Sequence, residues 1–242
     1  MPLHDWTKVN SGLYHHFHQV WMVEISRALN RGKLPKNLSA LVEQRTGFKQ
    51  PEAVAVEVAI PDEPWPSSGG TAVLERPRTR IPRKSEDEHY AESASRIVLR
   101  HRLGRIVAFI EIASPGNKDG RPALDEFVEK IVESLRQGIH VLVIDPGPPT
   151  PRDPDGIHKA IWDQIHVEDF DLPSNQNRVL ASYEFEMRGA YTSHIETVGV
   201  GDSLPEMPLF IAPGVHVLVP LEGPYMAACQ DTPDAIHRLV EA

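Results

Sequence analysis

Residues 106–145 read "IVAFIEIASPGNKDGRPALDEFVEKIVESLRQGIHVLVID", and this stretch decides the fold. It opens with an almost continuously apolar run, 106–112, which is typical of a strand covered on both faces. Residues 121–137 place their apolar side chains on one helical stripe and stop at Gly138, and 140–145 is a second apolar run. A strand, a helix and a strand in this order predict a βαβ unit with two parallel strands.

Glu111 is the acid inside the first apolar run. An ionised carboxylate on a buried strand is costly unless it is paired or bound to a metal. Alternation places it on the face of Phe109 and Ala113, near the carboxyl end of the strand, where sites collect in parallel-type sheets. Two interpretations stay open. Glu111 is either a functional acid, or the partner of Lys118 or Lys130 in a salt bridge that fixes the loop.

The composition is that of an ordinary globular protein. The chain has 242 residues, a formal net charge of -9 and one cysteine, Cys229. The charge argues against coating nucleic acid by bulk electrostatics, and one cysteine excludes an intrachain disulfide and a cysteine-rich zinc site. No signal pattern begins the sequence, and no apolar run approaches the ~18 residues of a membrane helix. We expect a cytoplasmic protein without a membrane partner.

The rest of the chain mixes helical and strand patterns. A helix is predicted at 11–31, and the region 61–93 is turn-rich and is interpreted as an excursion or a long hairpin. Further strands and helices are predicted at 38–44, 53–60, 95–114 (two strands), 153–165 (helix), 178–187, 216–222 and from Thr232 to the end (helix). The prediction is an α/β fold with a central mixed sheet flanked by helices. We expect one domain, 1–242, with an N-terminal helix, a core at about 38–165 and an extension at about 166–242.

Other patterns are weaker. His15 and His18 have the spacing of a helical metal pair, but packing or surface histidines are the more common outcome. Alternation along the strand places Arg96 and Arg100 on the same face, so they are candidates for contacts to a nucleic-acid backbone. The alternative is that this face of the sheet is simply exposed to solvent. The basic run at 76–84 is partly cancelled by the acids that follow it. Phosphate-loop, dinucleotide, zincin and classical hydrolase motifs are absent from the sequence.

Several segments together resemble a bacterial family catalogued as domain of unknown function 4058 (DUF4058). The segments are "MPLHDWTKVNSGLYHHFHQVWMVEISRALNRGKLP", "IEIASPGNK", "FVEKIVE", "HVLVIDPGPPTPRDPDGIHKAIWD" and "GDSLPEMPLFIAPGVHVLVPLEGPY". The resemblance runs over nearly the whole chain. It names no reaction, because the family has no firmly assigned activity.

The order of elements around Glu111 is also similar to the core of the PD-(D/E)xK nuclease superfamily, and "EIASP" to a motif of its Uma2-like relatives. The resemblance implies a restriction-endonuclease-like core with a C-terminal β extension. It implies a Mg²⁺ site made of Glu111 and an acid on the preceding strand, which is Glu52, or Glu57 if the register differs. Ala113 stands where the superfamily motif has lysine, so Lys118 or Lys130 would have to supply the ammonium.

Two hypotheses follow. The first is a Mg²⁺-dependent phosphodiesterase acting on nucleic acid, in which Glu52 and Glu111 bind the metal and Lys118 stabilises charge on the reacting oxygens. The second is a non-catalytic binding or protein-interaction module, in which Glu111 and Lys118 form a structural ion pair at the strand-to-helix turn.

Overall fold

The computed structural model describes residues 3–43, 81–85, 96–101, 104–186 and 189–241. Its strands form a seven-stranded mixed sheet, in the order β1-β3-β4-β5-β6-β7-β2, and a two-stranded hairpin, β8–β9. The strands are β1 (Leu38–Glu43), β2 (Ile81–Ser85), β3 (Arg96–His101), β4 (Ile106–Ile112), β5 (His140–Asp145), β6 (Arg178–Phe185), β7 (Tyr191–Val198), β8 (Met207–Ala212) and β9 (Val215–Val219). The predicted α/β class with a mixed central sheet is confirmed.

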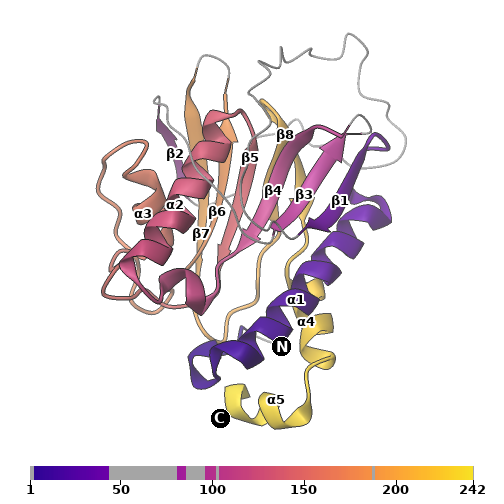
Figure 1. The fold of residues 1–242 in the computed structure, drawn as a ribbon, viewed down its shortest axis with the longest axis vertical. Helices are drawn as coiled ribbons and strands as arrows, with labels where there is room; N and C mark the ends of the chain where they lie inside the picture. The colour runs from indigo at the N-terminus through magenta and orange to yellow at the C-terminus, as the bar shows by residue number, and fades with distance from the viewer. Residues whose placement is uncertain (1–2, 44–80, 86–95, 102–103, 187–188, 242) are drawn as a thin grey trace.

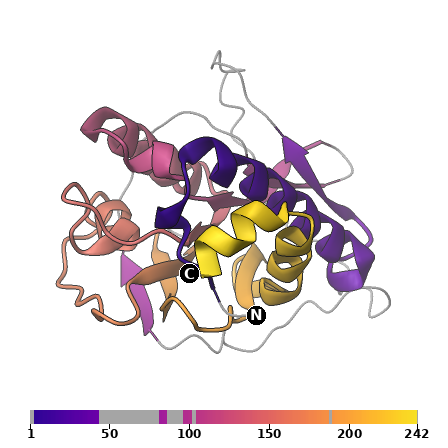
Figure 2. The ribbon, with the colours of Figure 1, turned by 90° about the horizontal axis from the view of Figure 1, so that it is seen from below.

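Helices cover both faces of the sheet (Figure 1). The helices are α1 (Ser11–Ala28), α2 (Arg121–Arg136), α3 (Gly156–Trp162), α4 (Glu222–Gln230) and α5 (Asp234–Glu241), with short turns at η1 (Trp6–Lys8), η2 (Leu29–Lys33) and η3 (Pro115–Lys118). Helices α2 and α3 pack on one face, while α1, α4, α5 and the β8–β9 hairpin share a core with the other. Figure 2 shows the yellow C-terminal helices on the same side of the molecule as α1; α4 packs against α1, and α5 contacts η1.

The β4–α2–β5 unit lies at the centre of this arrangement. Strands β4 and β5 run parallel, as predicted, and they form the parallel pair among the described strands. Along β4, Ile110 and Ile112 enter the core under α1, while Phe109 and Ala113 enter the core under α2. Because side chains alternate along a strand, Glu111 lies on the α2 face, as the sequence indicated.

Several predicted elements differ from the observed ones. The strand expected at 53–60 lies outside the described residues. Part of the predicted excursion, 81–85, is strand β2 and pairs antiparallel with β7. Three observed elements, β7, β8 and α4, were not predicted.

The end of α1 and the turn η2 that follows it protect one edge of the described sheet. In the described part of the sheet, β1 is an outer strand that pairs with β3 alone. The Asn30 carboxamide accepts a hydrogen bond from the Ala40 N–H (3.0 Å) and donates one to the Ala40 carbonyl (2.8 Å). Ser26 donates a second bond to that carbonyl (2.9 Å). These side chains therefore take the place of a neighbouring strand at this position.

The N-terminal segment is tied to α4. The Tyr225 hydroxyl accepts hydrogen bonds from the His4 main-chain N–H (2.9 Å) and from Trp6 Nε1 (3.0 Å). The His4 ring lies against the same hydroxyl, with Nδ1 at 2.8 Å. Tyr225 is completely buried, so one hydroxyl joins residues that are more than 200 positions apart in the chain.

Candidate functional site

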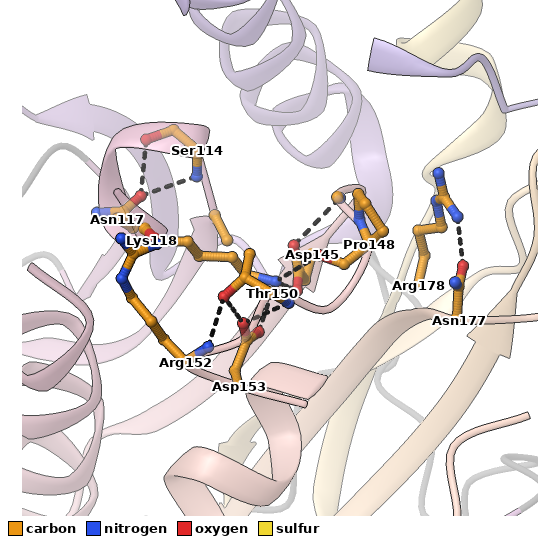
Figure 3. A network of polar contacts seen from close by, with 12 residues as sticks. Ser114, Asn117, Lys118, Asp145, Pro148, Thr150, Arg152, Asp153, Asn177 and Arg178 are labelled. Atoms are coloured by element: carbon orange, nitrogen blue, oxygen red, sulfur yellow. Dashed lines mark hydrogen bonds and ion pairs between the residues drawn. The ribbon is translucent and has the colours of Figure 1, made fainter. Parts of the chain in front are cut away.

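The candidate site lies where the parallel strands β4 and β5 end. After β4 the chain turns through η3, whose first turn is closed by Asn117: its carboxamide oxygen accepts hydrogen bonds from the Ser114 N–H and hydroxyl, both at 2.8 Å. Pro115 at the first position favours this short helix. The turn carries Lys118 back toward the end of β5 (Figure 3).

Lys118 is held by two carboxylates. Its Nζ lies 2.5 Å from Asp145 Oδ2, at the last residue of β5, and 2.7 Å from Asp153 Oδ2, in the loop before α3. It also donates to the Pro148 carbonyl at 3.2 Å. Asp145 and Pro148 accept hydrogen bonds from the ammonium group, and Asp153 forms an ion pair with it. Lys118 is 5 % exposed, so this amine meets its partners inside the protein.

The carboxylates are anchored on their other oxygens. Asp145 Oδ1 accepts from the Gly147 N–H (3.1 Å), and Asp153 Oδ1 accepts from the N–H and hydroxyl of Thr150. Burial raises the pKa of Asp145, although Lys118 counteracts it. Burial works to lower the pKa of Lys118, but the two carboxylates outweigh it and raise that pKa. The network therefore joins η3, β5 and the loop before α3 as one charged clamp.

Glu111 pairs with Lys130 and not with Lys118. Glu111 Oε1 lies 2.7 Å from Lys130 Nζ on α2, and the two residues are 2 % and 1 % exposed. The predicted Glu111–Lys118 pair is therefore wrong, and the alternative partner is the observed one. Burial raises the pKa of Glu111 and lowers that of Lys130, since the charged forms of both lose their hydration.

A second cation accompanies this pair. Arg96 is 4 % exposed and lies with its guanidinium carbon 4.4 Å from the centre of the Phe109 ring, on the face that Glu111 shares. Its charge lowers the pKa of Glu111 and also that of Lys130. The strand that pairs with β4 on this side, β3, thus begins with a buried arginine on the face that carries Glu111.

Of the remaining candidates, Glu52 and the fallback Glu57 lie outside the described residues. Arg100 forms a two-point contact with Glu43 of β1, Nε–Oε1 at 2.6 Å and Nη2–Oε2 at 2.8 Å. A shift in register between Leu99 and Arg100 interrupts the alternation that would have aligned it with Arg96.

The histidine pair of α1 is divided between core and solvent. His18 is buried and donates from Nε2 to the Ile112 carbonyl at the end of β4 (2.9 Å), while His15 is exposed. Tyr14 makes the equivalent contact to the Ala113 carbonyl (3.1 Å). Both side chains therefore fix the end of β4. Within the described ranges, no group of three histidine, cysteine or acidic side chains is placed to hold a metal ion.

Sequence reasoning missed Asp145 and Asp153. A signal for Asp145 was present, because it directly follows the apolar run of a strand predicted to be parallel to β4, so its side chain belongs at the same sheet edge as Lys118. Asp153 lies in a proline-rich loop with no periodic pattern, and no comparable signal marks it.

Comparisons with known proteins give no relative. The chain matches no protein-family model. It is similar to no curated protein and to no solved structure. Among the described helices, none is long and apolar enough to cross a bilayer.

Proposed function

We propose that this chain is a non-catalytic protein-interaction module built on a nuclease-like core. The observation that carries the proposal is the buried Glu111–Lys130 pair with Arg96 beside it. In the nuclease hypothesis a divalent cation balances Glu111, whereas here two side-chain cations supply that charge. A metal at this place would face Lys130 and Arg96 at close range, and like charges in a buried setting repel strongly.

Access to the site supports the same conclusion. Glu111, Lys130 and Arg96 are each at most 4 % exposed, and the Lys118 ammonium is already in contact with Asp145, Asp153 and Pro148. A phosphodiester would have to displace these contacts before it reached any of the amines. The described residues thus do not fit a resident Mg²⁺ ion, and we assign them no step through one.

Protein is the partner class that the charges favour. The net charge of -9 opposes a polyanion. Of the two arginines proposed to hold a nucleic-acid backbone, Arg96 is buried against Phe109, and the partly exposed Arg100 pairs with Glu43. Membership of the DUF4058 family, a cytoplasmic location and a restriction-endonuclease-like core belong to the same proposal. The arrangement α1, β1, β3, β4, α2, β5, with β4 and β5 parallel, supports the last of these.

One specific observation favours the second candidate, a Mg²⁺-dependent nuclease. Glu111 Oε2 has no hydrogen-bond partner among the described residues, and Lys130 stands beside the carboxylate, as the superfamily lysine would. If Glu52 or Glu57 approaches this oxygen, an acid–acid–lysine set is complete. The metal titration below separates the two candidates.

The test is calorimetric titration of Mg²⁺ and Mn²⁺ into wild-type protein, Glu111→Gln and Glu111→Gln/Lys130→Met, repeated with a DNA oligonucleotide and followed by a cleavage assay. The interaction-module proposal expects no metal heat, no cleavage and no oligonucleotide binding at about 100 mM salt. It also expects Glu111→Gln to lose about 3–5 kcal/mol of stability, because the buried Lys130 ammonium is left without its carboxylate. The double variant Glu111→Gln/Lys130→Met should recover most of that loss. Metal binding that disappears in Glu111→Gln would instead establish the nuclease candidate.

A further inference from the structure

Three imidazoles surround one phenyl ring between the β8–β9 hairpin and the large sheet. The centre of the Phe210 ring (β8) lies 6.1 Å from that of His140 (β5), 5.1 Å from His194 (β7) and 5.4 Å from His216 (β9). The four side chains are between 1 % and 7 % exposed. The hairpin therefore rests on the sheet partly through groups that can take up a proton.

The geometry requires the neutral form of His140. Its Nδ1 faces the Phe185 main-chain N–H at 3.2 Å, and a ring nitrogen accepts a hydrogen bond only when it carries no proton. Burial lowers the pKa of His140 to about 3. Burial, followed by the neighbouring His216, lowers the pKa of His194 to about 4, and burial also lowers the pKa of His216.

The charged side chains around these histidines do not offset the effect of burial on their pKa values. On β6, Glu184 accepts a hydrogen bond from the Gly214 N–H in the hairpin turn, so it holds the hairpin itself. Glu196 of β7 lies two residues beyond His194, on the same face of the strand. Glu186, just after β6, favours the charged form of His194, but burial outweighs it. Strand β8 itself is "MPLFIA", and β4 presents apolar side chains to the hairpin. The turn η2, which contacts β9, carries Arg31 and Lys33, and Lys33 pairs with Glu206 just before β8.

We propose that the β8–β9 hairpin is an acid-released element, which leaves the large sheet when its histidines become protonated. The release bares the apolar face of β5 and β6 against which β8 packs. Acid would thereby change the surface that this chain offers to a partner.

The direction and size of the pH effect on hairpin opening follow from the linkage between proton binding and opening. The folded pKa values lie below the ordinary 6.5, so the open form binds more protons at any pH between them, and closure weakens as the pH falls below about 6.5. Between pH 7 and pH 5, His140 and His194 each favour opening by about 20- to 25-fold. Together they give a change of several hundred-fold when both become fully hydrated on opening, which makes this an upper value.

Hydrogen exchange tests the proposal. Protection factors of peptides covering 207–219 are measured by mass spectrometry at pH 7 and pH 5, corrected for intrinsic exchange rates, and compared with those of α2. We expect hairpin protection to fall by up to several hundred-fold while α2 protection falls far less. An equal fall in both would show global unfolding, and no fall in the hairpin would show that its histidines are not linked to it; each result overturns the proposal.

Variants identify the responsible groups. His140→Asn keeps an acceptor near the Nδ1 position without a titrating ring, and His194→Gln removes the second site. Each should reduce the pH-dependent factor by roughly 20-fold. His16→Gln, at an exposed position of α1, is the matched control and should leave it unchanged. A full several-hundred-fold pH response that persists undiminished in both cluster variants would contradict the assignment, and the wild-type comparison stands even if a variant fails to fold.

Discussion

Replacing Lys118 with methionine removes the cation from the clamp at the end of β5. Asp145 and Asp153, 3 % and 2 % exposed, would each lose the partner of Oδ2 and keep only the contacts of Oδ1. Removing one member of a buried ion pair typically costs about 3–5 kcal/mol, because the opposite charge stays buried without compensation. That is a large fraction of the 5–15 kcal/mol, roughly, by which domains are stable.

Urea unfolding followed by tryptophan fluorescence measures this loss. We expect a midpoint lower by about 1 M or more at unchanged m-value, given m-values of about 1–3 kcal/mol/M. The control is Arg121→Met, which breaks an exposed pair with Asp125 and should cost under about 1 kcal/mol. In a triple variant, Asp145→Asn and Asp153→Asn should restore much of the lost stability. A loss for Lys118→Met no greater than that of Arg121→Met, or no recovery in the triple variant, would refute the clamp.

Three further predictions concern other parts of the fold. Asn30→Ala should cost about 1–3 kcal/mol by leaving the Ala40 main-chain groups unpaired, and it should increase concentration-dependent light scattering by opening the β1 edge. Tyr225→Phe should cost a similar amount in chemical unfolding, since the donors that share its hydroxyl stay buried. Gly156→Ala should lower the melting temperature more than Gly104→Ala: both glycines have positive φ, but only at Gly156 would a Cβ come within 3.1 Å of a neighbouring side chain. A further prediction is that the stability loss of Lys118→Met is smaller at pH 5 than at pH 8, because protonation of the buried Asp145 carboxyl relieves it, and this is checked by repeating the urea titration at both pH values.

The sequence predicted the centre of the fold because local patterns there agree with tertiary structure. The apolar runs at 106–112 and 140–145 are buried on both faces, and the stripe on the connecting helix is the face that packs on them. The placement of Glu111 beside Phe109 followed from alternation alone. Its partner did not, because Lys118 and Lys130 were both within reach of the strand end and only the path of η3 decides between them.

Elements with buried polar residues escaped prediction. Strand β7 carries Ser193, His194, Glu196 and Thr197 at buried positions, so its hydrophobic alternation is hidden. The clamp escaped for a different reason. Asp153 reaches Lys118 from a loop 35 positions away in the sequence, and a contact of that kind depends on how the loop folds back rather than on any residue pattern.

The bond between the N-terminal segment and α4 has a consequence for synthesis on the ribosome. Tyr225, whose hydroxyl accepts from His4 and Trp6, is added to the chain about 220 residues after them. At about 5–20 residues per second, Trp6 waits on the order of 10–45 s for the group that binds its indole N–H. Over that interval this segment of the nascent chain carries an aromatic side chain without its native cover. Helix α4, although made much later, is therefore the element that completes the burial of this segment.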